Sequence, residues 1–123
     1  MDINISKSKI LRIADGDTPV CDIRWLDLTK TCRVRMAAMY APELTEAGGI
    51  ESRDYLATIL TPNLQVFIQC HIVDGRGRPL GTIYLSKTAT VSVNQMMIDA
   101  GHATPVKLTT QIAQIKKALD YAP

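Results

Sequence analysis

The amino-acid sequence predicts an α+β domain that is mainly β, with short strands first and most of its helices toward the end. Two observations carry this prediction. Apolar and polar residues alternate over residues 21–25, 32–36 and 66–72, which is the pattern of strands with one buried face. In the last third of the chain, apolar residues recur instead at intervals of three and four, which is the spacing of a helix packed against a core.

The strands are expected on both sides of one central helix. The expected segments are residues 3–5 with 10–13, 21–25, 32–36, 66–72 and 80–85. Asp74-Gly75 is a hairpin signal between the last two of them. If the apolar side chains of the segment 32–36 face the core, Arg33 and Arg35 must face outward, because successive strand residues point to opposite sides. Arg35 is therefore expected on an exposed face that a ligand can reach.

Three helices are expected, each marked by a start or stop signal. The first ends before Pro62, which cannot continue a helix. The second begins at the capping box of residues 92–95 and ends at Gly101, which suits a C-terminal cap. The third covers residues 108–119, where apolar residues again follow the helical spacing.

These elements fit a five-stranded Greek-key barrel of the OB type with about three helices. Another α+β sandwich would use the same elements, so periodicity alone leaves both architectures open. With 123 residues the chain is long enough for one core and too short for two. Residues 1–123 are therefore expected to form a single domain, and we expect a monomer.

The composition excludes several classes of protein. The net charge is only +2, which argues against a generally cationic nucleic-acid coat. Three cysteines without paired spacing exclude a Cys-rich zinc site and a disulfide framework. No run of 18 apolar residues occurs, so no membrane span is expected. No signal peptide opens the chain, which predicts a cytoplasmic protein, or one of secreted origin if the chain is a processed fragment.

Two acidic and two basic residues are the candidate catalytic groups: Asp17, Glu43, Arg35 and Arg78. Hydrolysis at phosphorus places negative charge on the equatorial oxygens, and a planar guanidinium group matches two of them at once. Donors aimed at this developing charge contribute roughly 3–4 kcal/mol each, and a general base near the attacking water adds roughly a hundredfold. The set therefore suits phosphodiester cleavage, although Asp-Gly pairs are more often simple turns and strand arginines are more often solvated.

Short strings of residues carry a family resemblance. In chain order they are IADGDT (13–18), RVRM (33–36), APE (41–43), DGRGRPLG (74–81), VN (93–94) and GHA (101–103). This ordered set, between about residues 10 and 104, resembles the staphylococcal-nuclease-like (thermonuclease) family. The resemblance implies an OB barrel with three helices and calcium-dependent hydrolysis of DNA or RNA phosphodiesters.

The resemblance also implies a role for each candidate residue. Asp17 falls on a metal-binding aspartate, and Ala41 falls where the family offers a backbone carbonyl to the metal. Arg35 and Arg78 fall on the two arginines that hold the scissile phosphate and stabilise its transition state. Glu43 falls on the carboxylate that orients or deprotonates the attacking water.

Tyr40 departs from the family pattern, which has a second metal-binding aspartate at this position. A neutral phenol there removes one full negative charge. At an effective dielectric near 20, a unit charge about 4 Å from a divalent ion contributes on the order of 8 kcal/mol before desolvation. A calcium site is therefore expected to be weakened, unless Asp15 or Glu46 acts as a substitute ligand.

The second departure concerns the substrate. The family often has an aromatic residue where this chain has Arg76, and stacking of a base on an aromatic ring contributes about 1–3 kcal/mol. Arg76 is a candidate substrate contact that replaces this stacking in part, and Arg76, Arg78 and Lys87 are candidates for a local basic surface.

Three functions follow from these observations. The first is metal-dependent phosphodiester hydrolysis of single-stranded DNA or RNA. The second is a catalytically impaired OB module that binds nucleic acid without cleaving it, and the third is a module that binds a protein partner. Retention of both arginines and Glu43 favours the first two, whereas Tyr40 favours the second over the first. The sequence alone leaves open whether the protein is an enzyme.

Overall fold

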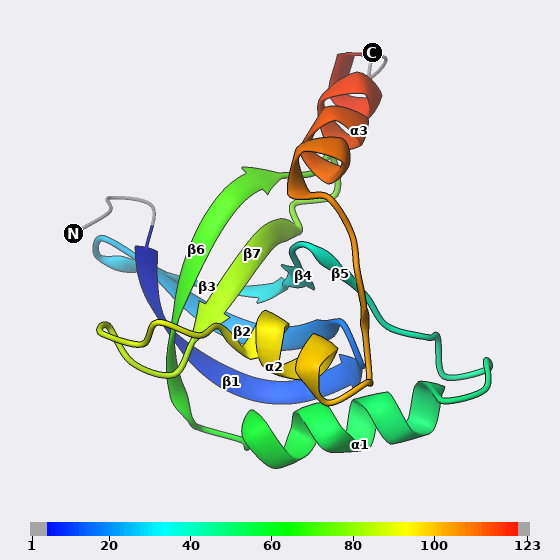
Figure 1. Ribbon diagram of the computed structural model, residues 1–123. Coiled ribbons are helices and arrows are strands. Elements are labelled where there is room, and N and C mark those ends of the chain that lie inside the picture. The colour runs from blue at the N-terminus through cyan, green and yellow to red at the C-terminus, as the bar shows by residue number, and fades with distance from the viewer. Residues whose placement is uncertain (1–4, 121–123) are drawn as a thin grey trace.

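The computed structural model describes residues 5–120, except for the side chain of Trp25. Its strands are β1 (Ile5–Asp15), β2 (Thr18–Trp25), β3 (Leu28–Arg33), β4 (Arg35–Met36), β5 (Met39–Tyr40), β6 (Gln65–Val73), β7 (Pro79–Tyr84) and β8 (Thr104–Pro105). Its helices are α1 (Gly49–Ile59), α2 (Val93–Asp99) and α3 (Leu108–Asp120). Figure 1 shows a curved sheet with α1 along one side of it and α3 near the ends of β6 and β7.

The predicted α+β class and its three helices are confirmed, but the sheet is not a closed five-stranded barrel. Six strands form one sheet in the order β3-β2-β1-β6-β7-β4, and β5 pairs with β8 in a separate ribbon. The strands β3 and β4 follow each other directly in the chain, yet they lie at opposite ends of this order. The sheet therefore has an OB-like curvature without a continuous ladder between its two edges.

The sequence predicts one strand over residues 32–36, but the structure divides this segment at Val34 into the end of β3 and the start of β4. The chain pairs with β2 up to Arg33 and then crosses to β7, where Arg35 lies beside Leu80 in a parallel pair. Val34 donates a backbone hydrogen bond of 2.9 Å to Pro19. The alternation of buried and exposed residues continues through the crossing, so the sequence pattern does not reveal it.

The opening strand is longer than predicted. Residues 5–15 form one continuous strand with two register irregularities, whereas the sequence predicts two pieces at residues 3–5 and 10–13; residues 3 and 4 lie outside the described part. The prediction missed the middle of this strand because of Ser8, a polar residue of which only 3% is exposed. Because Ser8 occupies an inward position, the segment does not show the apolar alternation of an ordinary strand.

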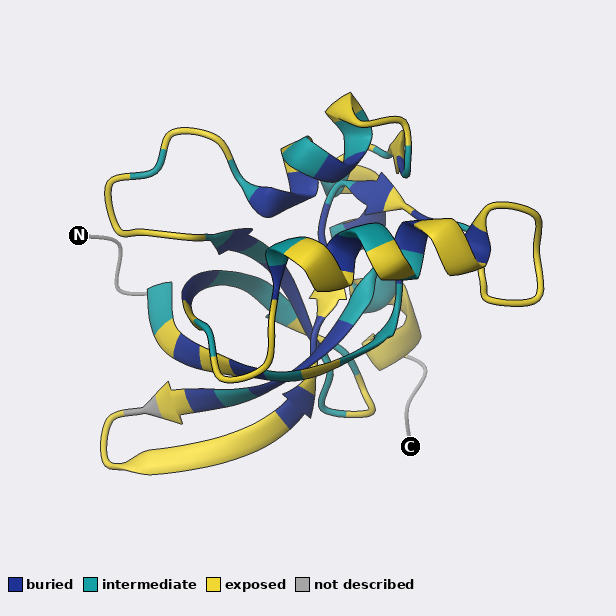
Figure 2. Cartoon of the chain, turned by 90° about the horizontal axis from the view of Figure 1, so that it is seen from below, coloured by how far each residue is buried: buried dark blue, intermediate teal, exposed yellow. Residues whose placement is uncertain are grey.

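The core lies between the inner face of the sheet and the first two helices. Its largest fully buried side chains include Ile10, Val34, Leu56, Ile83 and Met97. These come from β1, the β3–β4 crossing, α1, β7 and α2, so elements spread along the chain share one core, to which α3 contributes no residue of the buried hydrophobic cluster among the described residues. Figure 2 shows buried and exposed residues interspersed along α1, whose buried positions are Gly49, Ser52 and Leu56, whereas β3 is exposed along most of its length.

Asn94 fastens α2 to the sheet. Its side-chain amide donates to the carbonyl oxygens of Ala37 at 2.8 Å and Gly81 at 3.1 Å, and its Oδ1 accepts from the amide of Ile83 at 3.0 Å. All three contacts are buried, where an unsatisfied polar group would cost about 1–3 kcal/mol. Asn94 thereby holds β7 next to the segment that follows β4.

The predicted cap of α2 is confirmed, because Ser92 Oγ accepts a 3.0 Å hydrogen bond from the amide of Gln95. The third helix is also confirmed, and it docks through an amide group: Gln111 Oε1 accepts from the amide of Ala38 at 2.7 Å. None of the helices in the described part of the chain is both long and apolar enough to cross a membrane.

Candidate active site

The turn between β1 and β2 places Asp17 against the rest of the fold. The amide of Asp17 donates to Asp15 Oδ1 at 3.1 Å, and the hydroxyl of Thr18 donates to Asp17 Oδ1 at 2.9 Å. A Cβ atom on Gly16 would lie 2.8 Å from the Cβ of Ser52 and 3.0 Å from that of Ala41. Glycine is required here because the turn packs directly against α1 and the segment after β5.

The two carboxylates of this turn have opposite pKa shifts. The pKa of Asp17 is raised to about 7, mainly by burial and then by the hydrogen bond and negative charge of Asp15, which outweigh the lowering by Thr18 and Arg35. Burial also acts to raise the pKa of Asp15, but hydrogen bonds from Asp17 and Thr18 and the charge of Arg33 outweigh it, so that pKa is lowered. These shifts favour a protonated Asp17 beside an ionised Asp15 below about neutral pH.

Arg35 is exposed, as its position in the alternating pattern predicts. It lies in the two-residue strand β4, and its neighbour Met36 donates a 2.9 Å backbone hydrogen bond to the carbonyl of Asp17. The charge of Arg35 favours the ionised form of Asp17. The guanidinium group of Arg35 is thus a direct electrostatic neighbour of the β1–β2 turn.

Arg78 is held in place by the hairpin between β6 and β7. Asp74 Oδ1 accepts from the amides of Arg76 at 2.9 Å and Arg78 at 3.0 Å, and Asp74 Oδ2 accepts from Arg78 Nε at 2.8 Å. Gly77 takes a φ of +75°, which a residue with a side chain rarely adopts. The Asp-Gly signal therefore marks a turn that also orients an arginine through an ion pair.

Arg35, Arg76 and Arg78 line one hollow of about 480 Å³. Arg35 lies on β4, and Arg78 lies directly before the neighbouring strand β7. Arg76 comes from the hairpin that precedes β7. Asp74 also lines the hollow, with its charge already paired to Arg78. Lys87 does not extend this basic surface, because its ammonium group lies 5.7 Å above the ring of Phe67.

Helix α3 closes one side of this hollow, which the sequence did not predict. Gln111 and Gln114 line the hollow together with apolar groups of the same helix. Gln114 is exposed, and amide groups of this kind can donate and accept hydrogen bonds. In the sequence, Gln111 is visible only as a polar residue within an amphipathic helix. That pattern does not indicate where the helix docks.

Tyr40, Glu43 and Glu46 form a second group beside the Asp17 turn. The hydroxyl of Tyr40 donates to Glu46 Oε1 at 2.8 Å, and the amide of Glu43 donates to the same oxygen at 3.0 Å. The hydrogen bond to Glu46 is the main cause of the raised pKa of Tyr40, to which the charges of Glu46, Glu43 and Asp17 also contribute. Tyr40 thus lies within electrostatic reach of three carboxylates.

The structure brings these candidate residues together in two neighbouring groups. Arg35 links the hollow to the Asp17 turn beside the second group, because it lines the hollow with Arg78 and its charge favours the ionised form of Asp17. Glu43 belongs to the group around Tyr40, and it is not among the residues that line the hollow. A phosphate held by both arginines would therefore lie next to the acidic groups rather than between them.

The acidic group offers few side-chain ligands for a calcium ion. Calcium takes six to eight oxygen ligands, usually with several carboxylates. Within residues 5–120, no three acidic, histidine or cysteine side chains are arranged to share a metal ion. Glu46, a candidate substitute ligand, has one carboxylate oxygen engaged by Tyr40 and the amide of Glu43. Asp17 and Asp15 remain as adjacent carboxylates, and two side chains are fewer than a calcium ion usually requires.

Comparison with known proteins agrees with the class that this fold and site define. The fold is a small OB-like α+β domain with Arg35 on β4, Arg78 directly before β7 and an Asp-Gly-Asp turn, and the sequence similarity given next places the chain in the staphylococcal-nuclease-like family. The chain is 35% identical over 103 residues to the micrococcal nuclease of Shigella flexneri. This alignment covers 79% of the chain but only 56% of that relative. No family model matches the chain.

Proposed function

We propose that this nuclease-like domain hydrolyses phosphodiester bonds of single-stranded DNA or RNA. The observation that supports this proposal most directly is that Arg35 and Arg78 line the same hollow. Two guanidinium groups at one concave site match the oxygens of a phosphate, and they favour the additional charge of its transition state. The name of the similar protein from Shigella flexneri agrees with a nucleic acid as substrate.

Each residue has a distinct role in this proposal. Arg78 binds a phosphate oxygen through its terminal N–H groups, while Asp74 holds its Nε and fixes the plane of the guanidinium group. Arg35 binds the same phosphate from β4. Glu43 accepts a proton from the attacking water, and the hydrogen bond from its amide to Glu46 fixes the loop that carries it. Arg76 contacts a neighbouring phosphate at the edge of the hollow.

Asp17 and the carbonyl of Ala41 are the groups left to bind a calcium ion under this proposal. We expect weaker binding than in a site with two aspartates, because Tyr40 contributes no charge. The proton on the Asp15–Asp17 pair adds to this effect, since an ion must displace it near neutral pH.

A second candidate function is binding without cleavage, and the hydrogen bond between Tyr40 and Glu46 favours it. This bond joins the position of the missing aspartate to a carboxylate that would otherwise be free to approach a cation. The arginines in the hollow would still hold a phosphate, because their placement by β4 and Asp74 does not depend on the acidic group.

Cleavage of denatured DNA and of RNA, measured with calcium, magnesium, manganese and a chelator, separates the two functions. The proposal predicts cleavage in at least one of these conditions, and at least a hundredfold loss in Arg78→Ala with an unchanged circular dichroism spectrum. Lys87→Ala is the matched control, because it removes a cation outside the hollow. Salt-dependent binding with no cleavage under any condition would select the second function instead.

A further inference from the structure

A second hollow lies on the outer face of the sheet, away from the candidate active site. Its volume is about 420 Å³, and its lining comes from β1, β2, β3, the segment before β6 and the first residue of β6. It shares no lining residue with the hollow of Arg35 and Arg78. Three cationic side chains line it: Lys7, Lys9 and Arg24.

The sheet register brings these cations together. Lys7 and Lys9 are two residues apart on β1 and therefore point to the same side. Lys9 lies opposite Asp22 on β2, and Arg24 lies two residues further along β2, so it belongs to the same face. All three cationic residues are exposed. The cluster therefore results from strand pairing between segments that are separate in the sequence.

The cluster has an excess of positive charge. Among the lining residues within the described range 5–120, Asp22 is the one acidic residue. Asp22 Oδ1 accepts a 2.6 Å hydrogen bond from the hydroxyl of Thr31, and neither lysine approaches an acidic oxygen within 4.0 Å in the part of the chain that the structure describes. Three cations against one carboxylate leave a charge of +2, which equals the net charge of the whole chain.

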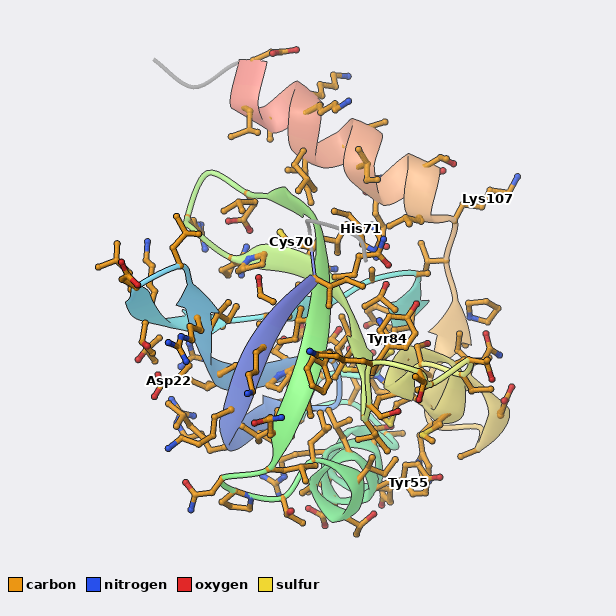
Figure 3. The ribbon with its side chains drawn as sticks, turned by 90° about the vertical axis from the view of Figure 1, so that its left-hand side faces the viewer. Asp22, Tyr55, Cys70, His71, Tyr84 and Lys107 are labelled. Carbon is orange, nitrogen blue, oxygen red and sulfur yellow. The ribbon has the colours of Figure 1, made fainter. Side chains whose placement is uncertain are left out.

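Neutral hydrogen-bonding groups complete the hollow. The amide side chains of Asn63 and Gln65 and the hydroxyl of Thr29 line it beside the cations. Such groups contact the phosphate and sugar oxygens of nucleic acids without reading the sequence. Figure 3 shows Asp22 on the side of the molecule opposite Lys107, at the outer surface of the sheet.

We propose that this outer hollow, lined by Lys7, Lys9 and Arg24, is a second binding site for the sugar–phosphate backbone of a nucleic acid. It would hold a strand that continues beyond the candidate active site and would raise the affinity for long substrates without taking part in cleavage. The choice of a nucleic acid rests on the proposed function, but the cationic site itself does not.

The test compares the triple variant Lys7→Gln/Lys9→Gln/Arg24→Gln with the control Lys87→Gln/Lys107→Gln/Lys116→Gln. Both variants remove three exposed positive charges, and only the first alters the outer hollow. Binding of a fluorescent single-stranded DNA of about 30 nucleotides, long enough to span several phosphate contacts, is measured at several sodium chloride concentrations without divalent cations. Cleavage of a trinucleotide is measured in parallel.

We expect the outer-hollow variant to bind the long strand about tenfold or more weakly at low salt than the control does. Loss of three phosphate contacts should also lower the slope of log K against log salt concentration by about 2. Trinucleotide cleavage should not change, because so short a strand does not span both sites. An affinity and slope equal to those of the control would overturn the inference while leaving the proposed cleavage intact.

Two further outcomes separate this inference from its alternatives. If the unmodified protein cleaves nothing but the outer-hollow variant still loses affinity for the long strand, the proposed cleavage fails and the second site stands. If the variant loses binding to phosphatidylserine vesicles but keeps its affinity for the long strand, the hollow serves an anionic membrane surface and the inference is wrong.

Discussion

The hydroxyl group of Tyr40 donates a 2.8 Å hydrogen bond to Oε1 of Glu46, and the same oxygen accepts from the amide of Glu43. Tyr40 stands at the position where the resemblance to the nuclease family predicts a second metal-binding carboxylate. This arrangement lowers the pKa of Glu46, mainly through the amide of Glu43 and then through Tyr40. The loop between β5 and α1 is therefore held by two neutral donors, a hydroxyl and a backbone amide, around the Glu46 carboxylate.

Replacing Tyr40 by aspartate is expected to increase calcium affinity at least tenfold. The substitution adds one negative charge beside Asp17, and even a quarter of the attraction of about 8 kcal/mol between a divalent ion and that charge would exceed tenfold in affinity. Isothermal titration calorimetry with calcium measures the change. Tyr40→Asn is the matched control, since it has the same size as the aspartate variant without the charge, and equal affinities of the two variants would contradict the expectation.

The raised pKa of Asp17 predicts a stability that depends on pH. Its folded-state value of about 7 exceeds the model-peptide value of 3.8, so between these values the folded state binds more protons than the unfolded state. The contribution of Asp17 is present below about pH 4 and is lost as the pH rises toward 7, with a slope of at most about 1.4 kcal/mol per unit.

Urea denaturation at about pH 4.5, 5.5 and 6.5, within the window between the two pKa values, measures this dependence. The free energy of unfolding of the unmodified protein should fall over this range more steeply than that of Asp17→Asn, which has no titrating group at this position. Asp27→Asn removes an exposed carboxylate and serves as the control. The same slope in all three proteins would show that Asp17 does not hold its proton into this range.

Asp74 is expected to matter for stability as well as for the orientation of Arg78. It accepts three hydrogen bonds, and contacts between ionised and polar groups contribute about 1.5–3 kcal/mol. Asp74→Ala should therefore lower the free energy of unfolding at neutral pH by about 2 kcal/mol. Asp74→Asn should lose less, since its amide oxygen can still accept from the backbone.

The acid limb of the denaturation curve gives a second readout for Asp74. Burial acts to raise its pKa, but hydrogen bonds from the amides of Arg78 and Arg76 and the charge of Arg78 outweigh this effect and lower the pKa. Its stabilisation is therefore present above pH 3.8 and lost as the pH falls through the lower folded-state value. An Asp74→Ala protein with the same stability at neutral pH as the unmodified protein would contradict this account.

The strand and helix pattern predicted much of the fold, because most buried positions are apolar and follow a regular period. It did not predict the continuous β1, since the inward Ser8 interrupts the apolar period. Nor did it predict the crossing between β3 and β4 at Val34, where the backbone changes its partner strand without a change in burial. Strand partners depend on tertiary pairing, which a local period does not encode.

The candidate site could be predicted as a set of residues but not as an arrangement. The sequence places Arg35 on an exposed strand face and Arg78 next to a turn. The structure adds that both residues line one hollow. The docking of α3 through Gln111 could not be foreseen, because a single amide makes the contact with Ala38 over a separation of 73 residues. The hydrogen bond between Tyr40 and Glu46 depends in the same way on the path of an irregular loop.

A double-mutant cycle on phosphate binding tests most directly whether Arg35 and Arg78 hold the same group. Affinity for a nucleoside 3′,5′-bisphosphate is measured by calorimetry for the unmodified protein, Arg35→Gln, Arg78→Gln and the double variant. We predict about tenfold or greater loss in each single variant and a loss in the double variant well below the product of the two, because the contacts are coupled through one phosphate. Losses that multiply, or single variants with unchanged affinity, would contradict a shared phosphate site.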